Sequence, residues 1–252
     1  MHLTNTDSPA ALPWYRFPET QPILDSIWKD VVSELRVAGV EHAPEFLDHT
    51  TAHRAFLSKP SLVLSQCCGP DLFQDDAVNM VPFAAPVISA YQVEPGYYFS
   101  HIVTGKSGVT SQSGVTGESA EHICPRVVIN SRTSHSGCTA VKLWLDAHGI
   151  EEYTIYESGS HHNSVRELQA GRADIAAIDA LSWRFLNTNG LEILDNSEPA
   201  LAPPFIAGCN STIPIDLMRP MLDSAFNRHG KSLGITGLVP ITKSDYRRLS
   251  SV

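Results

Sequence analysis

The 252-residue sequence has no long apolar run and no cluster of positive charge. No stretch approaches the roughly 20 apolar residues that a membrane-spanning helix requires, so no transmembrane segment is expected. Lys and Arg number 18 against 27 Asp and Glu, which gives a formal net charge of −9. Because nucleic-acid binding depends on clustered Lys and Arg, a nucleic-acid partner is not expected.

Cysteine is also scarce, with five residues in an odd number and no Cys-x-x-Cys pair, so a disulfide framework is not expected. The patterns nearest to a metal site are His122 with Cys124 and the adjacent His161 and His162. Neither is accompanied by a second cluster at zinc-ligand spacing. We therefore predict no metal and no cofactor.

The first residues, MHLTNTDSPAALPW, lack the basic segment and apolar stretch that mark a secretory signal. If no leader precedes them in the natural protein, a cytoplasmic location is expected. If a leader has been removed, an exported protein is equally compatible with this start.

Three stretches dominate the pattern of the chain: VVINSRTSHSG from Val127, YTIYESGSHHNSV from Tyr153 and ADIAAIDALSW from Ala173. In each, a short apolar run ends in small polar residues that open a segment with helical spacing, which predicts a strand-to-helix junction. In an open α/β sheet such junctions lie at the carboxyl ends of the strands, where ligands bind. The residues expected to meet around one crevice are Ser134, Ser136, His161 and Asp179.

The remaining helices and strands follow from spacing and turn residues. The four-residue spacing of Ile23, Ile27 and Val31 predicts a first helix at residues 22–38. Other predicted helices cover residues 51–58, 136–148, 163–170 and 215–227. Strands are predicted at residues 62–64, 87–91, 97–104 and 175–178, and long strands of this kind can cross from one lobe to another.

Two further segments have a predicted role. Residues 105–118 are rich in Gly, Ser and Thr, which is typical of an exposed flexible loop. The closing LGITGLVPITKSDYRRL should dock on the first lobe. Ser65 and Gln66 follow the predicted strand at residues 62–64. Trp14 and Tyr15 precede the first helix. Both pairs therefore lie at strand-to-helix junctions, where ligands of α/β sheets bind.

The chemistry of these junctions favours an anion. The first turn of a helix leaves backbone N–H groups unpaired, and the helix dipole adds partial positive charge there. Ser134 and Ser136 add hydroxyl donors, although Ser134 could simply cap its helix. His161 could donate to an oxyanion or be structural. Asp179 could accept a protonated ligand oxygen, bind an amine, or cap the helix that begins at Ala180.

Several motifs together resemble one family. Pro-Trp-Tyr near the start, LSQCCG, PGYYFS, the Ser-His-Ser-Gly helix start, GSHHNSVRELQAGRADIAAIDALSW and LGITGLVP are similar, in order and spacing, to the phosphate/phosphonate-binding family of ABC-transporter solute-binding proteins. The resemblance implies the α/β type 2 periplasmic-binding fold: two lobes, each a mixed sheet flanked by helices, joined by two crossing strands. It also implies a periplasmic location and a transporter permease as partner.

On this reading, lobe 1 comprises residues 1–97 and 196–252 and lobe 2 residues 98–195. By the resemblance, a ligand pocket would include Tyr15, Tyr98, Ser134, Ser136, His161 and Asp179. Ser65, Gln66 and His135 complete the predicted ligand-binding set because of their positions at the junctions. Family members more usually have Ser-Thr-Ser-Gly where this chain has His135.

The preferred hypothesis is a non-catalytic binding protein that closes on phosphate, a phosphonate or a related metabolite. A second hypothesis keeps the fold but gives it an aromatic or pyrimidine-like ligand that stacks on Trp14, Tyr15 or Trp183. A third makes the protein a hydrolase with Ser136 as nucleophile, His161 as base and Asp179 as orienting carboxylate, although no G-x-S-x-G motif is present. The identity of the ligand and the oligomeric state stay open.

Overall fold

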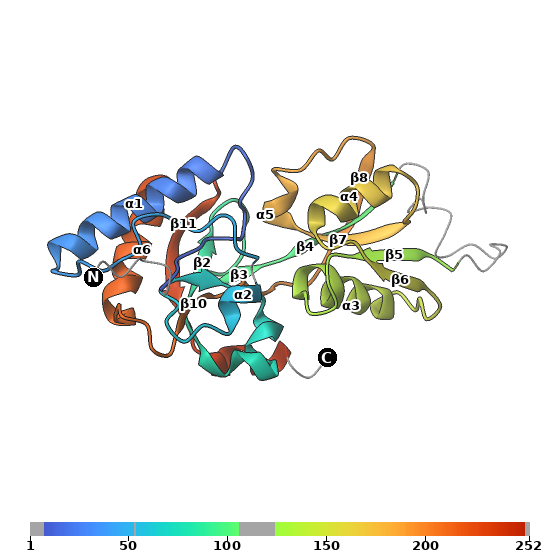
Figure 1. Ribbon diagram of the computed structural model, residues 1–252. Coiled ribbons are helices and arrows are strands. Elements are labelled where there is room, and N and C mark those ends of the chain that lie inside the picture. Colours follow the sequence, from blue (N-terminus) through green and yellow to red (C-terminus); the bar gives the residue numbers. More distant parts are fainter. Residues whose placement is uncertain (1–7, 53, 106–123, 250–252) are drawn as a thin grey trace. The chain divides into compact units, whose positions relative to one another are not determined.

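A computed structural model describes residues 8–52, 54–105 and 124–249 (Figure 1). Nearly all of the flexible loop predicted at residues 105–118 lies outside them. The chain divides into two compact units, and unit 2 runs from Tyr98 to Ala200 between the two segments of unit 1. The chain passes between units within β3 (Tyr97–Tyr98) and within β9 (Ala200–Leu201), and these short strands pair with each other. The chain therefore returns from unit 2 to unit 1 after Ala200, a few residues later than the predicted end of lobe 2 at residue 195.

Unit 1 is built on a four-stranded sheet with the order β1 (Ser65–Gln66), β10 (Phe205–Gly208), β2 (Met80–Ile88) and β11 (Ile235–Pro240). The neighbouring strands pair antiparallel, and an isolated parallel bridge joins Ala10 to Leu64. The helices of this unit are α1 (Gln21–Val37), α2 (Arg54–Leu57) and α6 (Ile215–His229). In the described part of the chain, no helix has both the length and the apolar character needed to span a bilayer.

Helix α1 matches the predicted first helix. Its apolar stripe is buried, and the Trp28 indole N–H donates to the carbonyl of Pro44 at 3.0 Å. The helix packs against α6 (Figure 1). Charged side chains also link the two helices. Arg228 of α6 donates to Asp30 and Glu34 of α1 at 2.9 and 2.6 Å. Burial of the stripe is the main stabilising contribution, because exposed ion pairs contribute little.

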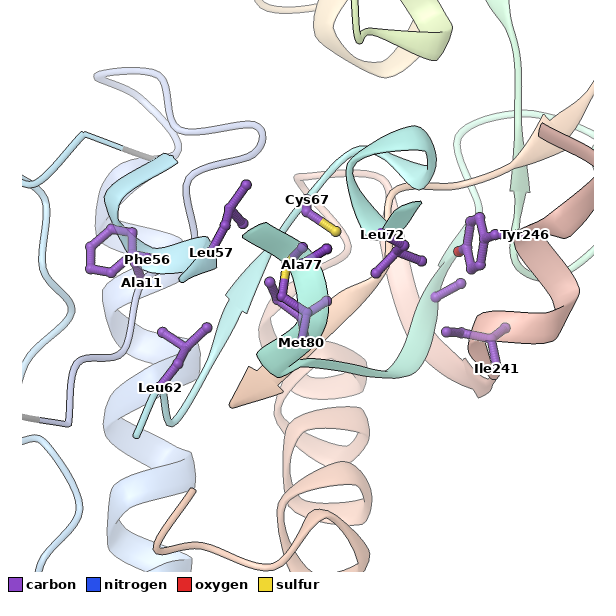
Figure 2. Packing of buried hydrophobic residues seen from close by; sticks show 12 residues of the cluster. Ala11, Phe56, Leu57, Leu62, Cys67, Leu72, Ala77, Met80, Ile241 and Tyr246 are labelled. Carbon is purple, nitrogen blue, oxygen red and sulfur yellow. The ribbon is translucent and has the colours of Figure 1, made fainter. Parts of the chain in front are cut away.

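The core of unit 1 joins segments that are distant in sequence (Figure 2). Phe56 and Leu62 come from the first part of the chain, whereas Ile241 and Tyr246 come from its end. Tyr246, on the 3₁₀ helix Lys243–Leu249, is fully buried and donates its hydroxyl to the carbonyl of Ala202 at 2.6 Å. The prediction that the closing segment docks on the first lobe is confirmed.

Two strand predictions in unit 1 are wrong. The sheet strand is Ser65–Gln66 rather than residues 62–64, because its partners, Ile206 and Phe205, come from a segment that local spacing cannot reveal. The next strand is Met80–Ile88 rather than residues 87–91. The sequence pattern did not predict this strand because it contains prolines, and proline normally argues against an internal strand.

Strand β2 accommodates those prolines at irregularities of its ladders. Pro82 is paired with Ile206 next to a register shift in β10, and Pro86 is paired with Leu238 next to another shift in β11. A register shift disturbs the regular ladder of hydrogen bonds beside it, and proline within a sheet is tolerated at such irregularities.

Unit 2 contains a five-stranded mixed sheet with the order β6 (Thr154–Glu157), β5 (Arg126–Ile129), β7 (Ile175–Asp179), β4 (Ser100–Gly105) and β8 (Leu191–Asn196). Strand β5 runs parallel to β6 and β7, and β4 runs antiparallel to β7 and β8. The helices are α3 (Ala140–Ala147), α4 (His161–Gln169) and α5 (Ala180–Trp183).

Both faces of this sheet are covered. Ile175 and Ala177 of β7 pack in the cluster of α3, whereas Ala176 and Ile178 pack in the cluster of α4. The prediction that residues 175–178 form a strand buried on both faces is confirmed, since every residue of β7 is buried. The carboxyl end of β7 is therefore held rigidly, and with it Asp179.

Candidate functional site

The junction after β5 is the best-defined feature of unit 2. Residues His135–Thr139 form a π-helical turn that leads directly into α3, so the helix predicted at residues 136–148 begins one residue earlier and with a different hydrogen-bond pattern. The Ser134 carbonyl accepts from the N–H groups of both Cys138 and Thr139, at 3.1 and 3.2 Å. Single π-helical turns are rare and are often found at functional sites.

Ser134 is the N-cap of this turn. Its hydroxyl accepts from the Gly137 N–H at 3.1 Å and lies 3.4 Å from the hydroxyl of Ser136. Among the described residues, no hydrogen bond uses the backbone N–H of His135 or of Ser136. The turn thus presents two backbone donors and the positive end of its dipole next to two serine hydroxyls.

Gly137 is required by close packing. A Cβ at this position would collide with the Asn130 side-chain oxygen, which already accepts from the Ser131 N–H at 2.9 Å. Sequence reasoning missed Asn130 as a supporting residue. The signal for it was the placement of an Asn directly after a buried strand, where its side chain readily bonds nearby backbone.

The second junction meets the first. The Ser160 hydroxyl caps α4 by accepting from the Asn163 N–H at 3.1 Å, so the helix begins at His161 rather than at residue 163. The Nε2 atom of His161 lies 3.0 Å from the Ser136 hydroxyl. Its Nδ1 atom is buried and has no hydrogen-bond partner among the described residues. A buried polar atom without a partner is costly, so this atom indicates a place for a ligand.

His135 and Tyr98 form a second contact at the same end of the sheet. The Tyr98 hydroxyl lies 3.3 Å from His135 Nδ1, and the two residues are 5% and 8% exposed. Burial lowers the pKa of both His135 and His161 to about 4, because removal from water disfavours the imidazolium. Both rings are therefore neutral at physiological pH.

Asp179 lies at the third junction, as the last residue of β7. Its carboxylate accepts from the Ser182 N–H at 2.8 Å and caps the short helix α5, and the residue is 4% exposed. Strand β7 is a parallel neighbour of β5 and packs against the His135–Thr139 turn. The expectation that Asp179 caps its helix is confirmed.

A catalytic triad is not formed. In a Ser-His-Asp arrangement the carboxylate accepts from the His nitrogen opposite the serine. Although Ser136 contacts His161, the opposite Nδ1 has no hydrogen-bond partner in the described part of the chain, which includes Asp179, so Asp179 does not orient this ring. Among the residues that the structure describes, no three His, Cys, Asp or Glu side chains group as metal ligands.

The predicted residues of unit 1 lie close together in their own unit. The backbone N–H of Trp14 donates to the side chain of Gln66 at 3.3 Å, and its indole donates to the Cys67 carbonyl at 3.4 Å. Tyr15 is buried in a left-handed conformation with φ of 60°, which is strained for a residue with a Cβ. The Ser65 hydroxyl is buried and has no partner among the described residues.

Trp183 packs within unit 2. Its ring meets that of His101 edge-on, with centroids 5.8 Å apart, and it lies against the cluster that includes α4. This is a packing role that a partly buried aromatic residue can take.

Comparison with solved structures identifies the fold. PhnD1 from Prochlorococcus marinus (MIT 9301), solved in complex with methylphosphonate, matches with a TM-score of 0.70 and 13% identity over 98% of this chain and 96% of its own. A binding protein component of an ABC phosphonate transporter from Pseudomonas aeruginosa matches with a TM-score of 0.65 and 12% identity over 96% and 85%. An R. palustris protein solved with adipate matches with a TM-score of 0.58 and 11% identity over 97% and 93%.

These likenesses confirm the α/β type 2 periplasmic-binding fold that the motifs predicted. A search of curated proteins gave no match. The family model described as "ABC transporter, phosphonate, periplasmic substrate-binding protein" matches residues 71–246, well over half of the sequence. The chain therefore belongs to this family, and it is a substrate-binding protein of the ABC-transporter type rather than an enzyme.

Proposed function

We propose that this protein binds a small oxyanion of the phosphonate class at the start of the His135–Thr139 turn. The observation that carries the proposal is the contact of Ser136 with His161 at 3.0 Å, beside a buried Nδ1 atom that no described residue satisfies. A ligand oxygen would supply the missing partner. Its binding would repay the cost of burying this atom.

The donors around this point suit a negatively charged ligand. The backbone N–H groups of His135 and Ser136, to which no described residue offers an acceptor, lie at the positive end of the turn and its helix. The Ser134 and Ser136 hydroxyls and the His135–Tyr98 pair add polar groups that can turn a proton toward a ligand oxygen. Several donors converging on one point are what a tetrahedral oxyanion requires.

Solved proteins of this fold hold anions of different size. The Prochlorococcus protein was solved with methylphosphonate, a Xanthomonas citri protein of similar fold with ATP, and the R. palustris protein with adipate. Methylphosphonate is the first probe for this chain, because the family match concerns phosphonate transport. The family also implies a transporter permease as partner.

Tyr15, Ser65 and Gln66 of unit 1 stay predictions as ligand-binding residues. Two observations support them: Tyr15 is held in a strained backbone conformation, and the buried Ser65 hydroxyl lacks a partner among the described residues. Strain and unsatisfied polar groups concentrate at binding sites.

The aromatic-ligand alternative has less support. Trp183 packs against His101, and the Trp14 indole is engaged by the Cys67 carbonyl, so two of the three rings named for stacking already have partners within the fold.

The test is calorimetric titration with phosphate, phosphite and methylphosphonate. The protein is first unfolded, dialysed and refolded to remove any ligand carried through purification, and native mass spectrometry checks that it is empty. We expect at least one of the three anions to bind at micromolar concentration or below, with a Ser136→Ala variant at least tenfold weaker. Flat titrations with all three on ligand-free protein would contradict the proposal.

A further inference from the structure

Unit 1 contains a cavity that the proposed function does not use. It has a volume of about 620 Å³ and lies between α1 and the segment of residues 45–49, within unit 1. None of the predicted ligand-binding residues lines it. A volume of this size is typical of pockets that hold a small organic molecule. We call it the α1 cavity.

The wall opposite α1 is held in place. Trp28, which is buried on α1, donates its indole N–H to the Pro44 carbonyl at 3.0 Å, and Leu47 is buried. The Asp48 N–H donates to the carbonyl of Ala10 at 2.8 Å. The cavity is therefore preformed, and binding does not carry the entropic cost of ordering this segment.

The lining of the α1 cavity includes a continuous set of apolar side chains. Trp28 and Val32 contribute from α1, and Phe46 and Leu47 contribute from the opposite wall. Phe46 is 75% exposed although the segment that carries it is fixed. A single exposed apolar residue has no particular meaning, but one at the edge of an apolar cavity adds area that a ligand can cover.

Two cations stand along the α1 wall. Lys29 and Arg36 both line the cavity, seven residues and so about two helical turns apart. In the ranges that the structure describes, neither side chain forms an ion pair or a hydrogen bond. Both positive charges are therefore available to a ligand in the cavity.

The acidic side chains of α1 do not balance these cations. The Asp25 carboxylate lies 2.7 Å from Nε2 of His49, and the other two acidic residues of the helix accept from Arg228 of α6. Glu45 is the acidic residue of the opposite wall. The α1 wall thus carries more unpaired positive charge than the opposite wall carries negative charge.

We propose that the α1 cavity binds a small organic anion with an apolar body, such as an aromatic sulfonate or carboxylate. The apolar body would cover Phe46 and Leu47, and the anionic group would meet Lys29 or Arg36. Burial of the body supplies most of the affinity, because exposed ion pairs contribute little by themselves. The cations select the sign of the ligand's charge.

Two fluorescent probes test the role of the cations. The anion 8-anilinonaphthalene-1-sulfonate becomes brighter in apolar surroundings, and N-phenyl-1-naphthylamine has the same rings without the sulfonate. We expect the sulfonate to bind the natural protein at micromolar concentration. A Lys29→Gln/Arg36→Gln double variant should bind the sulfonate at least about fivefold more weakly and the neutral amine as before, because only the sulfonate uses the cations.

The control for this double variant is Lys59→Gln/Lys231→Gln. It makes the same change of charge at two residues of unit 1 that do not line the cavity, so it should bind both probes like the natural protein.

Phe46→Ser tests the apolar wall. The variant should bind both probes at least about fivefold more weakly, because each loses ring contact. Val78→Ser is its control, since Val78 is 77% exposed and does not line the cavity. Both variants change exposed side chains, so their thermal melts should match that of the natural protein.

Three results would each overturn the inference. One is the absence of any change in sulfonate fluorescence up to about 1 mM probe. Another is equal affinity of the natural protein and both cavity variants for the sulfonate. The last is displacement of the sulfonate by methylphosphonate, which would place the probe at the oxyanion site. Failure of methylphosphonate itself to bind would contradict the proposed function and leave this inference intact, because the two sites share no lining residue.

Discussion

The Ser136 hydroxyl lies 3.0 Å from Nε2 of His161, although the residues are 25 positions apart in sequence. The contact exists because β5 and β6 are parallel neighbours, with Arg126 opposite Thr154, so the helical segments that follow them begin at the same edge of the sheet. Each start has its own serine cap, Ser134 in one case and Ser160 in the other. The N-termini of the two helical segments therefore lie next to each other, and their first-turn side chains are in contact.

His161→Asn tests the importance of this contact for binding. The shorter side chain should lose the bond to Ser136 and the buried Nδ1 atom, and we expect methylphosphonate affinity to fall about 10- to 100-fold. The neighbouring His162→Asn is the control, since His162 is exposed and should leave affinity unchanged. Equal affinities of the two variants in calorimetry would show that His161 does not contact the ligand.

Stability should fall in mildly acid solution. The pKa of His135 is about 4 in the folded protein and about 6.5 in the unfolded chain, so the unfolded chain binds more protons between these values. The free energy of unfolding should therefore be constant above pH 6.5 and decrease as the pH falls toward 4, by up to about 3 kcal/mol for this residue. The same direction applies to His161.

Urea unfolding at pH 7.5, 6.0 and 5.0 measures this decrease. A His135→Thr variant should lose less stability than the natural protein over that range, because the site no longer titrates. Parallel curves for the two proteins would show that His135 is not held neutral by burial.

Gly137→Ala should disturb the turn. The new methyl group would collide with the Asn130 side chain, and we expect a loss of about 1–3 kcal/mol in the free energy of unfolding together with weaker ligand binding. Adding Asn130→Ala should restore part of the loss because it removes the obstacle. Thr139→Ala, at a partly exposed position of the same turn, is the control for a general effect of substitution.

Tyr246→Phe tests how the closing segment is anchored. The variant keeps the buried ring but removes the hydroxyl that donates to the Ala202 carbonyl, so we expect a loss of about 1–3 kcal/mol in the free energy of unfolding. Tyr97→Phe, at a partly exposed ring, should cost much less. A thermal melt of Tyr246→Phe identical to that of the natural protein would contradict an anchoring role.

The elements read most accurately from sequence are those whose pattern is local. The stripe of α1 and the doubly buried β7 were placed within a residue, because periodic burial and continuous apolar runs are properties of the segment itself. Strands β1 and β2 were misplaced. Their partners are remote in sequence, and the prolines in β2 lie beside register shifts in β10 and β11 that no local pattern reveals.

The order of the motifs by itself determined the family, the two-unit α/β fold and the polar residues that follow the buried strands, since these depend on residue identity and spacing. The tertiary structure alone decided how those residues meet. It showed the π-helical turn, the contact of Ser136 with His161, the unsatisfied Nδ1 atom and the packing of Gly137 on Asn130. Such contacts depend on which strands are neighbours, and strand order follows from the packing of the whole sheet rather than from any one segment.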